Sequence, residues 1–266
     1  MRIAKEFNGE IICADSRTIY KGMDIGTAKP SAREQKEIPH WGLDLAEPGE
    51  SFSAGKFKDY AQAKINDIQN RGKLAILVGG TGLYVDGVLY DFAFINKRVA
   101  WRRLVYSWWS VDKLQKMIQQ RDWPLPENAR NRRHLIRTIE REGQVGSRKK
   151  NLPPDVLLLG LLPPDNVLRQ RIENRAQQMF KTGIAAETKG LLKQYGERAL
   201  RRSGGIIYPI IVDLLRSKIS KTQALSLFQA KDWQYARRQK TWFKRNPDIR
   251  WFSGPDEAYT FLTKVL

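Results

Sequence analysis

The stretch from Glu10 to Pro30 (EIICADSRTIYKGMDIGTAKP) constrains the fold more than any other part of the chain. Its first residues, 10–13, form a mostly apolar run that predicts a buried strand, and polar residues follow at once. Open α/β sheets bind their ligands at the carboxyl ends of their strands. We therefore predict that Asp15 and Ser16 lie at a ligand-binding edge of a sheet, with Asp15 as a candidate base.

A loop with a hydroxyl group and an ammonium group follows this turn. Thr27 and Lys29 come just after Gly26 in the sequence. A hydroxyl can donate a hydrogen bond to a phosphate oxygen, and an ammonium group adds its charge. We expect this loop to meet a phosphorylated ligand.

Strand and helix patterns alternate over residues 1–92, with an apolar pattern of helical spacing at 53–71 and a buried-strand pattern at 73–78. Such alternation is typical of a parallel sheet covered by helices. Over residues 93–152 four tryptophans stand among many cations, which predicts an inserted helical region. Residues 153–266 begin with a strand pattern at 156–162, continue as mostly helical sequence, and complete the α/β core.

The charge of the chain indicates a polyanionic partner. It has 47 Lys and Arg against 28 Asp and Glu, a net charge of +19. Nucleic acid is the first candidate, and an acidic membrane surface is the alternative. The sequence shows neither an apolar run of about 18 residues nor a charged-then-apolar leader, so we expect a cytoplasmic protein with no membrane partner. Its single cysteine, Cys13, excludes an internal disulfide.

Five segments in order resemble the family of tRNA dimethylallyltransferases, also called isopentenyl-tRNA transferases. They are residues 14–30, 40–53 (beginning HWGLD), 77–84 (LVGGTGLY), 171–183 (RIENRAQQMFKTG) and 235–242 (YARRQKTW). The resemblance is weakest at about residues 93–128. It implies a P-loop-NTPase-like parallel sheet flanked by helices, with an inserted helical tRNA-binding region and a helical C-terminal part.

The resemblance also implies a reaction. This family transfers a dimethylallyl group from dimethylallyl diphosphate to N6 of the adenosine 3′ of the anticodon in tRNA, with Mg²⁺ as cofactor, and its members generally act as monomers. In this chain Asp15 would be the base at the amine and Arg175 would neutralise the diphosphate, with Thr27 and Lys29 as further diphosphate-binding residues. The metal ligands stay unknown.

A set of tRNA contacts follows from the same resemblance. Arg133 and Arg137 match the family's tRNA-contacting pattern, although His134 stands where Arg is usual. A solvated helix face is the alternative for these two arginines. A second basic cluster at residues 237–245 is interleaved with Tyr235, Trp242 and Phe243, and cations next to aromatic rings suit backbone phosphates and an unstacked base. For Trp242, core packing and base stacking both stay open. The expected contacts are Asp15, Ser16, Arg17, Thr18, Arg133, Arg137, Arg237, Arg238, Gln239, Lys240, Trp242 and Lys244.

One part of the family pattern is missing. Family members begin with a strand and a Gly-rich loop ending in Gly-Lys-Thr or Gly-Lys-Ser, which holds a pyrophosphate, whereas residues 1–7 resemble the helix after that loop. We expect further residues upstream in the natural protein, and an inner strand to be absent from the sheet here. There are two competing hypotheses. One is a catalytically inactive homologue that only binds tRNA. The other is an adenylate prenyltransferase acting on free nucleotide, which the net charge of +19 disfavours.

Overall fold

The computed structural model describes residues 1–95 and 100–266, with side chains described outside 96–102. It divides into two units. The first unit comprises residues 1–89 and 152–266, and the second unit comprises residues 90–151. The expected insertion ran from 93 to 152, within a few residues of the second unit.

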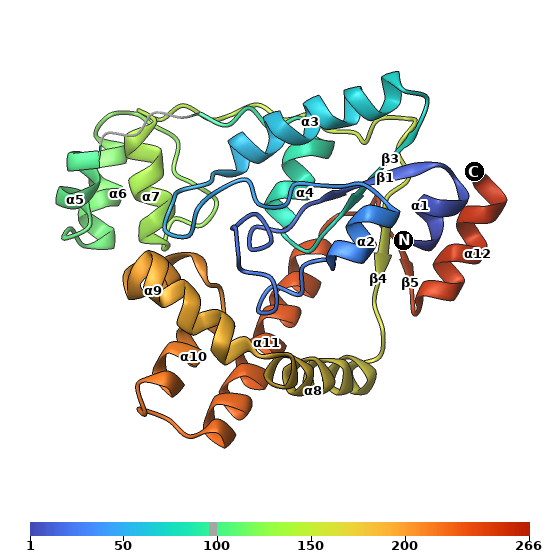
Figure 1. Cartoon of the computed structure of the whole chain (residues 1–266). Coiled ribbons are helices and arrows are strands. Elements are labelled where there is room, and N and C mark those ends of the chain that lie inside the picture. The colour runs from blue at the N-terminus through green and yellow to red at the C-terminus, as the bar shows by residue number, and fades with distance from the viewer. Residues whose placement is uncertain (96–99) are drawn as a thin grey trace. The chain divides into compact units, whose positions relative to one another are not determined.

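Two parallel sheets form the centre of the first unit (Figure 1). In one sheet β1 (Gly9–Cys13) lies between β2 (His40–Trp41) and β3 (Leu74–Val78). The other sheet pairs β4 (Leu159–Leu161) with β5 (Arg250–Phe252). The predicted class, parallel strands flanked by helices, is confirmed, although a single sheet was expected. Among the described strands, β3 and β4 each pair along one edge only. The expected absence of an inner strand stays a prediction.

Helices account for most of the rest of the first unit. The helix α3 starts where predicted, because the side chain of Ser53 accepts a hydrogen bond from the backbone N–H of Lys56. The helix α11 starts with a capping box between Ser220 and Gln223. The helices are α1 (Arg2–Glu6), α2 (Ala32–Glu37), α3 (Ala54–Asn70), α4 (Gly82–Leu89), α8 (Asp165–Thr182), α9 (Ile184–Ser203), α10 (Ile207–Leu215), α11 (Lys221–Phe243) and α12 (Pro255–Val265).

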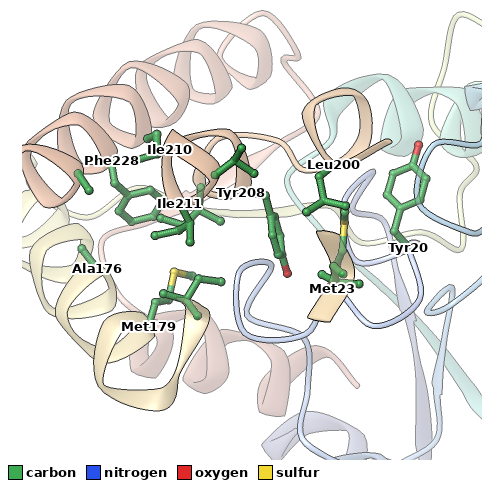
Figure 2. Close-up of a cluster of buried hydrophobic side chains, with 14 of the residues drawn as sticks. Tyr20, Met23, Ala176, Met179, Leu200, Tyr208, Ile210, Ile211 and Phe228 are labelled. Atoms are coloured by element: carbon green, nitrogen blue, oxygen red, sulfur yellow. The ribbon is translucent and has the colours of Figure 1, made fainter. Parts of the chain in front are cut away.

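The largest hydrophobic core joins the segment after β1 to the helices α8–α11. Figure 2 shows Tyr20 and Met23 of that segment beside Leu200 of α9 and Tyr208 of α10. The segment and α10 pack closely at Gly26, where an added Cβ would lie 2.6 Å from the Tyr208 ring. The N-terminal segment that carries the candidate site is therefore packed on C-terminal helices.

The second unit is a small helical body with its own core. It contains α5 (Ala100–Tyr106), α6 (Val111–Gln119) and α7 (Arg132–Glu140). Apolar side chains of α6 and α7 form this core, namely Leu114, Ile118, Leu135, Ile136 and Ile139. Residues 90–151 thus form a compact unit with three helices among the described residues.

Nowhere in the described parts of the chain does a helix have both the length and the apolar character needed to cross a membrane.

Candidate active site

Asp15 lies in a tight turn directly after β1. Its Oδ1 accepts a hydrogen bond from the backbone N–H of Arg17 at 2.7 Å. The hydroxyl of Thr18 points back to the carbonyl of Asp15 at 3.4 Å. An aspartate that bonds to the backbone two residues on stabilises such a turn. The carboxylate is half-buried and held at the carboxyl end of the strand, which is where the sequence pattern placed it.

The turn after β3 is joined to this turn through Thr81. Its hydroxyl oxygen accepts a hydrogen bond from the backbone N–H of Ser16 at 2.9 Å and lies 3.3 Å from the Ser16 hydroxyl. The backbone N–H of Thr81 donates to the carbonyl of Ala14 at 3.2 Å. At Gly79 an added Cβ would lie 2.1 Å from the same carbonyl oxygen. Glycine therefore allows the ends of β1 and β3 to meet, and Thr81 holds them together.

One face of α11 covers these two turns. Its side chains there are spaced by three and four residues, as one face of a helix requires. Gln239 donates to the carbonyl of Gly80 at 2.9 Å. The indole N–H of Trp242 donates to Asp86 at 2.8 Å, and its ring lies against Gly82 of α4. These contacts of Trp242 are packing contacts, so they favour the first of its two interpretations. The residues of this face are Asp232, Tyr235, Gln239 and Trp242.

Tyr235 is the member of this face whose phenol interacts electrostatically with the candidate base. Burial raises the pKa of its phenol, and the negative charge of Asp15 adds to that effect. The phenol also interacts with the side chains of Thr81 and Gln239. The sequence analysis counted Tyr235 among aromatics of a basic cluster and missed its position beside Asp15.

Arg175 is oriented by a buried carboxylate. It lies on α8 and forms an ion pair with Asp232 of α11. The Arg175 side chain is 46% exposed, whereas that of Asp232 is 6% exposed. The guanidinium also lies 6.0 Å from the ring of Phe228. One side of the guanidinium is thus fixed by the protein and the rest is open to a ligand.

Lys29 and Thr27 both use their donor groups inside the protein. The Thr27 hydroxyl donates to the carbonyl of Met23 at 2.5 Å. The Lys29 ammonium lies 2.6 Å from Asp24, 2.7 Å from Asp44 and 3.0 Å from the carbonyl of Tyr20. Only 2% of the Lys29 side chain is exposed. These contacts favour a structural role for Lys29, and its expected contact with diphosphate stays a prediction.

The loop that carries Thr27 is anchored by Glu187 of α9. The carboxylate accepts hydrogen bonds from three consecutive backbone N–H groups, those of Asp24 (3.2 Å), Ile25 (2.8 Å) and Gly26 (3.2 Å). The phenol of Tyr208 donates to the same carboxylate at 2.6 Å. Burial and this nearby charge raise the pKa of Tyr208. Sequence reasoning missed Glu187, because nothing in the local pattern links it to a loop so far away in the chain.

The described residues do not offer a ready-made cage for a metal ion. They include no group of three acidic, histidine or cysteine side chains that could share one. Asp24 and Asp44 do converge, but the ammonium of Lys29 lies between them. Mg²⁺ is usually held by one or two carboxylates together with substrate phosphates. The donor set fits a metal that arrives with a diphosphate better than one held by protein ligands alone.

The cations of α11 lie on different sides of the helix. Arg237, Lys240 and Lys244 line a groove of about 330 Å³ with Asp165 and Leu168 of α8, and Lys240 lies 3.2 Å from Asp165. Their spacing places them opposite the face that covers Asp15. Arg238 instead lines a second groove of about 280 Å³, together with Lys231 and Gln234 among others. The cations of α11 are therefore distributed over two sides of the helix.

The remaining expected tRNA contacts fall in two places. Arg17 is exposed, and its guanidinium donates to the carbonyl of Ser203 at 3.0 Å. Arg133 and Arg137 lie on α7 of the second unit, where Arg133 is exposed and Arg137 is half-buried. The N-terminus of α7 is capped by Asn131, whose side chain accepts from the backbone N–H of Arg133 at 3.0 Å.

Comparison with known proteins identifies the family. A family model described as IPP transferase matches residues 18–246. The tRNA dimethylallyltransferase of Bacillus mycoides is 35% identical over 97% of this chain and 86% of its own length.

Solved structures agree. A tRNA delta(2)-isopentenylpyrophosphate transferase from Staphylococcus epidermidis is 32% identical, with a TM-score of 0.69 over 99% of this chain and 93% of its own. A eukaryotic dimethylallyltransferase that acts on tRNA shares the fold, with a TM-score of 0.76 at 23% identity over 94% of this chain and 69% of its own. The chain therefore belongs to the IPP transferase family, as its sequence motifs indicated.

Proposed function

We propose that this chain modifies tRNA by transferring the dimethylallyl group of dimethylallyl diphosphate to N6 of the adenosine 3′ of the anticodon. The observation that carries the proposal is the position of Asp15. Its carboxylate is held at the end of β1 by the N–H of Arg17, beside the turn of Thr81 and next to Tyr235 of α11. Membership of the IPP transferase family supports the two substrates.

Asp15 acts as the base in this proposal. The exocyclic amine of adenine is a poor nucleophile, because its lone pair is delocalised into the ring. Asp15 accepts a hydrogen bond from N6 and takes its proton while the new C–N bond forms. The C–O bond to the diphosphate breaks, and its electron pair leaves with the diphosphate. General-base help of this kind contributes about 10²–10⁴-fold to the rate.

Arg175 stabilises the leaving diphosphate. Its guanidinium is pre-oriented by the pair with Asp232, so little reorganisation is needed as negative charge develops. We place Thr27 and Lys29 in the same diphosphate site, Lys29 through the shape that it gives to the loop. Mg²⁺ bound with the diphosphate would add positive charge at the leaving group.

tRNA binding has to expose the target base. Taking the adenosine out of its stack costs a few kcal/mol and is easiest in a loop, so the anticodon stem-loop is a suitable substrate. Phosphate contacts from the basic residues offset this cost. We propose that the chain binds tRNA as a monomer. The proposed contacts are Asp15, Ser16, Arg17, Thr18, Arg133, Arg137, Arg237, Arg238, Gln239, Lys240, Trp242 and Lys244.

A tRNA-binding homologue without activity is the second candidate. The observation that favours it is the burial of Lys29, since neither Lys29 nor Thr27 directs its donor groups to an outside ligand. Binding of tRNA without binding of diphosphate would distinguish this candidate from the enzyme.

The test is transfer from labelled dimethylallyl diphosphate to an unmodified anticodon stem-loop RNA, measured with this chain and with a version extended by whatever its gene encodes upstream. The proposal expects label on the adenosine 3′ of the anticodon. An RNA with guanosine at that position is the matched control and should stay unlabelled. RNA binding with no transfer by either version would contradict the proposal and favour the inactive homologue.

A further inference from the structure

Trp108 exposes a large aromatic surface on the second unit. Its side chain is 83% exposed, and the neighbouring Leu104 and Val105 are 70% and 45% exposed. The backbone N–H of Trp108 donates to the carbonyl of Val105 at 3.2 Å, so Trp108 continues the last turn of α5. Aromatic residues dominate the energetics of cores and interfaces because each buries a large area. An apolar patch of this kind marks an interaction site.

The core of the unit does not use Trp108. The adjacent Trp109 packs on that core, with its ring edge-on to Tyr106 at 5.3 Å and the ammonium of Lys113 over its face at 4.1 Å. Trp123 also packs on this core. The side chain of Trp101, the fourth tryptophan of the region, lies outside the described residues. The core of the second unit therefore packs without the side chain of Trp108.

The surroundings of Trp108 are strongly basic. Residues 90–151 contain 15 Lys and Arg and six Asp and Glu, which is +9 of the net charge of +19 in under a quarter of the chain. One of these cations, Arg132, donates from its guanidinium to the carbonyl of Ser107, the residue before Trp108. A flat ring next to fixed positive charge suits a nucleic acid, whose bases stack while its phosphates meet cations.

We infer that Trp108 stacks on an unpaired base of the RNA that the second unit binds. The inference rests on the proposed function, because it assumes an RNA substrate, and it adds a contact outside the family motifs. A membrane surface fits less well, since an interfacial helix buries a broad apolar face, whereas the exposed apolar side chains described for this patch are those of Leu104, Val105 and Trp108.

The experiment measures the affinity of a labelled, unmodified anticodon stem-loop RNA for the wild-type chain, W108A and W108F. Loss of one stacked base predicts a fall in affinity of about 5- to 150-fold for W108A. W108F keeps a ring and should lose much less. The matched control is V145A, which removes an exposed apolar side chain of the second unit outside this patch and should leave the affinity unchanged.

Salt dependence and RNA structure separate stacking from charge. W108A should keep the wild-type slope of log affinity against log salt, whereas R133A should reduce that slope by about one if Arg133 contacts a phosphate. A fully paired RNA duplex should bind W108A and the wild type equally, because it offers no unpaired base.

Three results would overturn the inference. W108A could bind the stem-loop as the wild type does, or it could lose affinity for the duplex and the stem-loop alike. It could also melt well below the wild type, which would make Trp108 a packing residue. Failure of the wild-type chain to bind any RNA would overturn the proposed function together with this inference.

Discussion

Lys29 holds one positive charge between two carboxylates, and its ammonium also donates to a backbone carbonyl. We predict that K29M lowers the free energy of unfolding by about 1–3 kcal/mol, because Asp24 and Asp44 lose their partner while both remain partly solvated. The matched control is K21M, since Lys21 pairs with Glu47 on the surface, where solvent screens the pair, and its loss should change the stability much less. Urea unfolding measures the free energy of unfolding of both variants. Unchanged stability of K29M, with diphosphate binding lost, would make Lys29 a ligand group instead.

Arg175 and Arg171 lie four residues apart on α8 and provide a matched pair. Both side chains are exposed, and Arg175 is held by its ion pair with the buried Asp232. R175A should lower the rate of transfer by about 10²–10³-fold, the usual cost of removing one preorganised donor from a developing charge. R171A should transfer at the wild-type rate. Equal effects of the two substitutions would remove Arg175 from the proposed mechanism.

At the scale of elements, α9 fixes the loop of Thr27 through one side chain. E187Q keeps the shape of Glu187 but replaces a charged acceptor of three backbone N–H groups by an amide. We predict a loss of about 1–3 kcal/mol of stability and faster amide hydrogen exchange at Asp24, Ile25 and Gly26. The control is E173Q, on the exposed face of α8. Wild-type protection of these three amides in E187Q would show that the loop keeps its shape without Glu187.

The elements that the sequence predicted well are those with long, regular patterns. Strand β1, helix α3 and strand β3 follow directly from apolar runs and helical spacing. Strands β2 and β5 were missed because they span only two and three residues, too few for a pattern. Strand β4 is shorter than the predicted strand at 156–162.

For the site residues too, the sequence indicates positions that lie in a regular local pattern and does not indicate contacts between distant segments. The position of Asp15 at the end of a strand was predictable because a buried strand precedes it. Helical spacing puts Gln239 and Lys240, two of the expected tRNA contacts, on different faces of α11. Glu187 and Thr81 were out of reach as site residues, because their roles are contacts to residues more than 60 positions away in the chain.

At the scale of the whole molecule, the acid stability of the first unit depends on a buried carboxylate in β1. Glu10 is 2% exposed and accepts hydrogen bonds from Arg71, Lys73 and Trp41. These partners, Arg71 first, hold the pKa of Glu10 well below its usual value of 4.5. The folded state therefore releases this proton more readily than the unfolded state.

The sign of the pH dependence follows from that depressed pKa. The contribution of Glu10 is fully present above pH 4.5 and is lost as the pH falls from there toward the folded pKa. We predict that E10Q is less stable than the wild type at pH 7, and that the difference shrinks on acidification below about pH 4.5. Thermal unfolding of E10Q and the wild type across this pH range measures the difference in stability. A difference that stays constant with pH would contradict the prediction.

The central claim is that Asp15 is the base of a transfer to tRNA. The most direct test compares D15N with the wild type, each extended by whatever the gene encodes upstream, by single-turnover transfer of labelled dimethylallyl groups to the anticodon stem-loop RNA and by RNA affinity. We predict that D15N transfers about 10²–10⁴-fold more slowly, because an amide cannot take the proton from N6, while its RNA affinity stays largely intact because the other proposed contacts remain. Wild-type turnover in D15N would contradict the assignment of Asp15 and the mechanism built on it.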